Sequence, residues 1–237
     1  MFRSYTLAFV TFVTLFVTAN FAIGAVTAWT SVPVRVYDAS GLDERLRQAA
    51  LDVAGTTLAP TSVEVTWRVC GPSNKQATYC NTVLAPGELA IRIVRIPAVT
   101  DRSGGVRLGD AFIDTHAGRG VLATIYLDRV LHLAEQTGAD RVALLGHAIA
   151  HELGHLLMAS NVHGSIGLMR GFWSLEEVRN DKPTDWTIAP RDANAIRRGA
   201  EVHHALAGGG DADRGREPVL GVRDPGLAAP GSEFGVR

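Results

Sequence analysis

Apolar and polar residues alternate along several short stretches in the first half of the chain. Alternation with a period of two predicts β-strands with one buried face, and it is clearest in the stretch VEVTWRV. An apolar stripe at helical spacing over residues 42–58 predicts a helix after the first strand. We expect five strands, at residues 32–37, 63–69, 89–96, 110–114 and 122–127.

The second half of the chain has helical patterns instead. Residues 130–135 predict one or two turns of helix, and a long helix is expected to start near Asp140. That long helix is apolar on nearly every side, which is typical of a helix buried through the middle of a domain. A last helix is expected from 191 to about 207.

The buried helix carries the motif H-E-x-x-H, formed by His151, Glu152 and His155. Residues four apart lie on one face of a helix, so both imidazoles can reach one metal ion. Glu152 then lies beside the metal, where a carboxylate can take a proton from bound water. The motif is short enough to arise by chance, and buried histidines are often ordinary core residues. A further histidine, a glycine and a methionine soon after it favour a zinc site.

With these residues the chain resembles the zincin metallopeptidases, and more narrowly metzincins of the matrixin or archaemetzincin kind. In metzincins the motif continues to a glycine and a third histidine ligand, and a methionine turn follows. Residues 167–169 (GLM) look like that turn, which would make Met169 an apolar floor below the metal. Met158 replaces the family glycine and Asn161 replaces the third histidine, while the next histidine, His163, comes two residues late.

Two residues are therefore candidates for the third metal ligand. His163 lies in a polar segment bounded by glycine, which is suited to turning back after the helix, and we predict that it completes the site. Glu177 is the alternative, because glutamate on a following helix is the third ligand in gluzincins. However, residues 174–177 (SLEE) also match a capping box, which predicts the start of a short helix. We expect His147, one turn before His151, to be a core residue rather than a ligand.

The resemblance implies an α+β, zincin-like fold. A mixed β-sheet in an N-terminal subdomain would pack on the long HExxH helix, and a small, mostly helical subdomain would follow. One strand, at 111–115 or 122–126, would line the cleft and pair with an extended peptide substrate.

Both ends of the chain differ from this domain, which we place at residues 29–207. Residues 1–28 have a basic start and an apolar, uncharged run, so they predict a signal peptide or an N-terminal anchor. We favour cleavage, no stable membrane insertion afterwards, and a secreted or periplasmic location. Residues 208–237 are rich in glycine and proline, which predicts a disordered tail.

The two cysteines, Cys70 and Cys80, are close in sequence, and in an exported protein such a pair predicts a disulfide. Residues 68–72 are also faintly similar to the cysteine switch of matrixin prosegments, which requires a free thiol.

The formal net charge is −1, and no block of lysine or arginine suggests a nucleic-acid partner. The predicted function is that of an exported zinc metallopeptidase acting on peptides or proteins. Zn²⁺ held by the three histidines would activate a water molecule, with Glu152 as general base. The alternatives are an inactive zinc-binding module and a structural exported domain.

Overall fold

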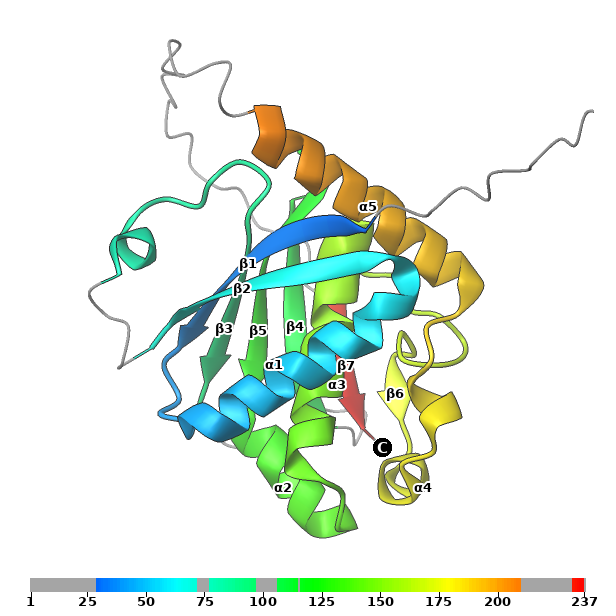
Figure 1. Ribbon diagram of the computed structural model, residues 1–237. Coiled ribbons are helices and arrows are strands. Elements are labelled where there is room, and N and C mark those ends of the chain that lie inside the picture. The colour runs from blue at the N-terminus through cyan, green and yellow to red at the C-terminus, as the bar shows by residue number, and fades with distance from the viewer. Residues whose placement is uncertain (1–28, 72–76, 97–105, 115, 210–231, 237) are drawn as a thin grey trace, which may run out of the picture.

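The computed structural model describes residues 29–71, 77–96, 106–114, 116–209 and 232–236 (Figure 1). The predicted signal segment at 1–28 lies outside these residues. Within the part of the chain that is described, no helix is both long and apolar enough to cross a membrane.

A mixed β-sheet is built mainly from the first half of the chain. Four of its strands run parallel, and β4 lies antiparallel beside β5. Two short strands, β6 and β7, extend the sheet beyond β4, so the spatial order is β2-β1-β3-β5-β4-β7-β6. The strands are β1 (Thr30–Asp38), β2 (Val63–Cys70), β3 (Leu89–Val94), β4 (Val106–Asp114), β5 (Arg119–Tyr126), β6 (Phe172–Trp173) and β7 (Ser232–Val236).

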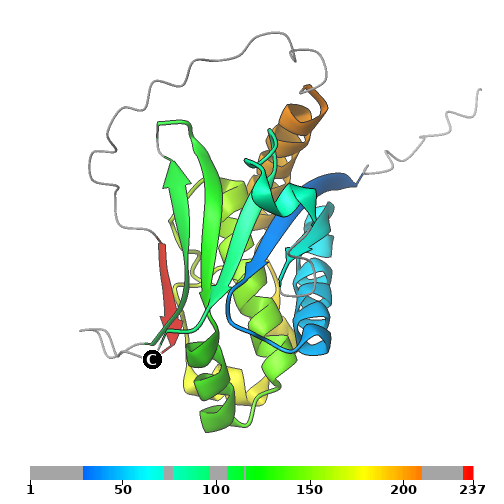
Figure 2. The same ribbon diagram turned by 90° about the vertical axis from the view of Figure 1, so that its left-hand side faces the viewer.

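Helices α1 and α3 pack side by side against one face of this sheet, as Figures 1 and 2 show. The α-helices are α1 (Glu44–Leu58), α2 (Leu127–Thr137), α3 (Arg141–Met158), α4 (Leu175–Asn180) and α5 (Pro190–Gly209). The predicted mixed sheet packed on the HExxH helix is confirmed at this level. The division into two subdomains stays a prediction.

Helix α3 is central because it is covered on all sides. Every residue from Leu144 to Leu157 is buried, in agreement with the apolar pattern. The side chain of Asp140 accepts a hydrogen bond from the backbone N–H of Ala143 and so caps the first turn. The helix ends at Ala159, which has a left-handed conformation with φ 48° and turns the chain back towards the helix.

The predicted disulfide is confirmed, because Cys70 at the end of β2 is bonded to Cys80. A cysteine switch is thereby excluded, since no thiol is free at Cys70. The bridge closes the loop that follows β2.

The prediction of a disordered tail over 208–237 is wrong in two places. Residues 208 and 209 extend α5, and Ser232–Val236 form β7. Strand pairing uses backbone groups, which every non-proline residue carries, so composition alone did not reveal this strand. Residues 210–231 lie outside the described part of the chain. Strand β7 pairs with β4 between Val106 and Ala111, so it meets the predicted cleft strand 111–115 only at its first residue. The other candidate, 122–126, lies inside the sheet between β3 and β4.

Candidate metal centre

Two histidines of α3 point their ring nitrogens at each other. Nδ1 of His151 lies 2.8 Å from the carbonyl oxygen of Leu168, and Nδ1 of His155 lies 2.7 Å from that of Ser160. A carbonyl only accepts, so each Nδ1 carries the proton and each neutral ring leaves a lone pair on Nε2. The two Nε2 atoms are 3.0 Å apart.

The third histidine reaches this pair from the segment after α3. After the turn at Ala159, the backbone N–H of Gly164 donates to the carbonyl of Met169, 2.8 Å away, and this contact closes the loop. The ring centroid of His163 lies 4.8 Å from that of His155 and 5.5 Å from that of His151. The structure therefore brings together the three histidines that we predicted, with one ligand atom of each within 4.8 Å of the others.

This donor set fits a metal cation. Two lone pairs 3.0 Å apart with no proton between them repel each other, and a cation between them removes that repulsion. Nε2 of His163 is buried and has no hydrogen-bond partner among the described residues. Zinc bonds to nitrogen of about 2.0–2.1 Å place two tetrahedral nitrogen ligands roughly 3.3 Å apart, close to the observed separation.

The electrostatics of the cluster also favour neutral ligands. Burial lowers the pKa of His155 to about 4, although its hydrogen bond to Ser160 opposes the shift. Burial lowers the pKa of His151 well below its usual range, and the neighbouring His155 adds to the effect. Burial also lowers the pKa of His163. At neutral pH all three rings are therefore in the neutral form, as metal ligation requires.

Glu152 lies beside the histidines and is fully buried. Neither carboxylate oxygen has a hydrogen-bond partner within the described structure. Burial raises its pKa well above the usual range, and the negative charge of Asp110 adds to that shift. A buried carboxylate without a partner is costly, so its retention beside three histidines points to chemistry at this position.

Two glycines provide the space that this arrangement needs. A Cβ on Gly109 of β4 would lie 2.8 Å from Oε1 of Glu152. A Cβ on Gly154 of α3 would lie 2.6 Å from the sulfur of Met169, which is itself fully buried against the helix. Met169 thus packs against α3 at Gly154, the residue before His155. Its place in a methionine turn stays a prediction.

The aromatic residue Trp173 supports the cluster from β6. Its indole N–H donates to the carbonyl of Leu168, the same oxygen that His151 uses, at 3.3 Å. Its ring also lies edge-on to the His151 ring, with centroids 6.0 Å apart. These contacts fix the orientation of His151 from two sides.

The alternative ligand Glu177 lies outside the cluster. Its Oε1 pairs with Arg170, while Oε2 accepts from the backbone N–H of Ser174 at 2.8 Å and from its hydroxyl at 2.9 Å. The capping box on α4 is thus confirmed, and it accounts for Glu177. His147 stacks on Trp186 at a centroid distance of 4.3 Å, so it packs in the core as expected.

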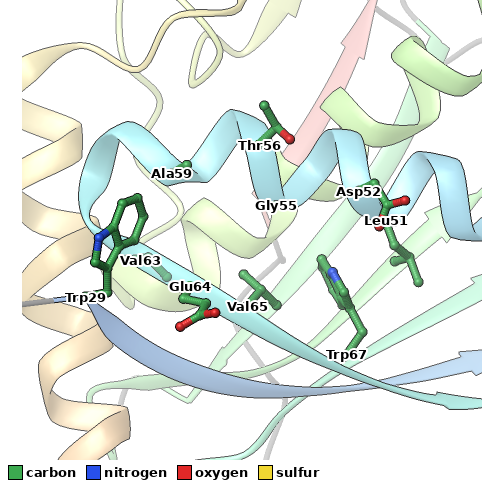
Figure 3. Close-up of a pocket in the computed structure, with 10 residues that line it drawn as sticks. All are labelled: Trp29, Leu51, Asp52, Gly55, Thr56, Ala59, Val63, Glu64, Val65 and Trp67. Atoms are coloured by element: carbon green, nitrogen blue, oxygen red, sulfur yellow. The ribbon is translucent and has the colours of Figure 1, made fainter.

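A pocket of about 600 Å³ lies at the opposite edge of the sheet from the histidine cluster, between α1 and β2. Figure 3 shows Trp29 and Trp67 on either side of Val65, with Asp52 and Thr56 on the helix above. None of the three clustered histidines lines this pocket, and its walls are mainly apolar.

Comparisons with known proteins give a distant structural likeness. No protein-family model matches the chain, and no curated protein matches it either. The crystal structure of archaemetzincin from Methanopyrus kandleri is similar, with a TM-score of 0.44 and 15% identity. The match covers 76% of this chain and 99% of that one. Because the likeness is this distant, the functional argument rests on the geometry of the site: a mixed α/β domain whose three histidines can hold a metal ion.

Several residues that shape the site were missed at the sequence level. Gly109 and Gly154 carry no metal-binding signature, and the carbonyl oxygens of Leu168 and Ser160 carry no sequence signal. A glycine inside a strand or helix does indicate a close approach, so the two glycines could have been found from their positions.

Proposed function

We propose that this chain is an exported zinc metallopeptidase. The observation that supports it best is the convergence of His151, His155 and His163 beside the buried carboxylate of Glu152. Three neutral imidazoles with a further position left for water or substrate form the ligand set of many catalytic zinc sites. The disulfide and the apolar sequence of residues 1–28 support export.

The residues have separate roles in this proposal. The three histidines would hold the metal through their Nε2 atoms, and the carbonyls of Leu168 and Ser160 keep the rings of His151 and His155 in the required tautomer. When bound, zinc would lower the pKa of a water ligand towards about 7 and polarise the carbonyl of a peptide bond. Glu152 would accept the proton of the attacking water at a carboxylate oxygen and later deliver it to the leaving amine.

The environment of Glu152 suits this task. A carboxyl group with its ordinary pKa holds a proton too weakly to return it efficiently at neutral pH, whereas burial raises the pKa of Glu152 well above that range. Bound metal would oppose this shift, because a nearby cation favours the carboxylate. The metal would thus favour the ionised carboxylate, which is the form that can accept a proton.

The deciding experiment compares zinc content and hydrolysis in three proteins. The wild type should bind one equivalent of zinc and hydrolyse quenched-fluorescence peptides, with activity lost on chelation and restored by zinc. Glu152→Gln should still bind zinc but lose at least ~100-fold in turnover, the usual size of a general-base effect. Glu176→Gln is the matched control, because Glu176 is an exposed glutamate on α4 and its change should alter neither property.

The outcomes distinguish this proposal from the two alternatives, an inactive zinc-binding module and a structural exported domain. Zinc binding without hydrolysis in any variant would favour a metal-binding module. Absence of zinc from the wild type, purified with the metal supplied, would leave only a structural domain. Undiminished hydrolysis by Glu152→Gln would reject the role of that residue.

A further inference from the structure

The C-terminal strand β7 is inserted between two elements that border the candidate site. It pairs antiparallel with β4, with Val106 opposite Val236 and Ala111 opposite Ser232. On its other side it pairs parallel with β6, where Phe172 is opposite Gly235. Figure 2 shows this red strand beside β4, towards one edge of the sheet.

Both neighbours of β7 touch the residues of the metal centre. In β4, Gly109 lies against the carboxylate of Glu152, and Gly109 is the residue that pairs with Phe234. In β6, Trp173 lies edge-on to the ring of His151 and pairs with Val236. The strand therefore passes beside the candidate catalytic residues rather than along a remote edge.

The space between β4 and β6 fits an extended peptide backbone. Two strands that each present an unpaired edge can hydrogen-bond an extended peptide on both of its sides, largely independently of its sequence. Any segment held there excludes another from the same backbone groups. The chain's own C-terminus and an extended substrate would thus compete for one slot.

We propose that the C-terminal strand is an intramolecular inhibitor that fills the peptide-binding slot between β4 and β6. This inference rests on the proposed peptidase function for its regulatory meaning, although the slot itself is a structural feature. The inhibitory strand must withdraw before an extended substrate can pair with β4. Residues 210–231 connect it to α5, so withdrawal requires no dissociation from the chain.

The tether sets the expected strength of inhibition. A segment on the same chain as its binding site has an effective concentration that is of the order of millimolar when the connection can span the distance. If the free segment binds the slot with a dissociation constant of about 0.1 mM, the ratio of occupied to empty slots in the intact chain is about ten to one.

The first test removes the pairing while leaving the chain at full length. Amide groups of consecutive strand residues point to opposite edges, so a Phe234→Pro, Gly235→Pro double variant loses one donor towards each neighbour. The matched control, Phe234→Ala with Gly235→Ala, keeps both amides. We expect the proline variant to show a KM about tenfold lower than wild type with kcat unchanged, and the alanine control to show a smaller change. An unchanged KM in the proline variant would overturn the proposal.

The second test does not depend on catalysis. A fluorescent peptide with the sequence of residues 232–237 (SEFGVR) is titrated into Glu152→Gln proteins with and without the double proline change. The peptide should bind at least ~10-fold tighter when the tethered strand carries prolines, and a peptide that contains the same prolines should not bind. Equal binding by both proteins would reject the slot. Peptide binding without hydrolysis in any variant would instead contradict the peptidase function and leave the slot supported.

Discussion

The sulfur of Met169 lies 2.6 Å from the place where a Cβ on Gly154 would be. Helix α3 and the segment that carries Met169 therefore meet in close contact one residue before His155. A glycine inside a helix costs about 1 kcal/mol relative to alanine, and here the cost is offset by the contact that it permits.

We expect Gly154→Ala to destabilise the protein by about 1–3 kcal/mol and to weaken zinc binding, because the added methyl group overpacks a filled core and shifts Met169. Urea unfolding and zinc titration would measure the two effects. The control is Gly208→Ala on α5, where a Cβ would meet nothing within 4 Å.

A double variant assigns the cause of that loss. Met169→Ala added to Gly154→Ala should recover part of the stability, because the shorter side chain leaves room for the methyl group. Strict additivity of the two single changes would contradict the packing explanation.

Gly109→Ala should separate metal binding from catalysis. Its methyl group would lie 2.8 Å from Oε1 of Glu152 and 2.9 Å from the carbonyl oxygen of Thr124, so the carboxylate must move. The histidines do not contact Gly109 in this way, so zinc content should persist. We expect kcat to fall at least ~10-fold at unchanged zinc stoichiometry, measured by peptide hydrolysis and metal analysis. Equal losses of zinc and activity would point to general unfolding instead.

Local sequence patterns predicted most helices and strands, because burial of one face leaves a periodic pattern of apolar residues. The alternation in β2 and the apolar run of α3 follow directly from which faces are covered, so both were visible in the sequence. Asp140 and the capping box at Ser174 also marked their helix starts correctly. The pairing of Cys70 with Cys80 followed from their short separation.

The parts that could not be predicted depend on backbone geometry and on contacts between distant segments. His163 was predicted as a ligand, but the turn that brings it back to α3 was not, because it uses a left-handed residue at Ala159 and alanine gives no signal for that conformation. Strand β7 follows a stretch rich in glycine and proline and pairs through its backbone, so its composition suggested disorder. Such pairings depend on where the neighbouring edge lies, which no local pattern records.

The third ligand can be tested by comparing two single variants. His163→Ala should weaken zinc binding by more than roughly 10–100-fold. That smaller loss is typical when the removed residue only hydrogen-bonds to a metal ligand. Glu177→Ala should keep its zinc and lose about 1 kcal/mol of stability, because the carboxylate caps α4 and pairs with Arg170. Competition with a chromophoric chelator measures both affinities. Loss of zinc from Glu177→Ala with retention in His163→Ala would reverse the assignment.

His147 should make the stability of the fold depend on pH. Burial lowers the pKa of its ring to about 4, and the negative charge of Asp181 opposes the shift only in part. The unfolded chain takes up a proton near pH 6.5, whereas the folded chain takes it up only near pH 4. The unfolded state therefore binds more protons in this window, so the contribution of His147 is full above pH 6.5 and falls as the pH drops towards 4.

The variant His147→Phe keeps a flat ring against Trp186 but cannot take up a proton. Between pH 7 and pH 5 the wild type should lose about 2 kcal/mol more stability than this variant, following from the two pKa values. Urea unfolding at both pH values gives the difference, and the other histidines are common to both proteins, so their contributions cancel. If the two proteins lost the same stability over this range, His147 would not be the buried neutral group that its stacking on Trp186 indicates.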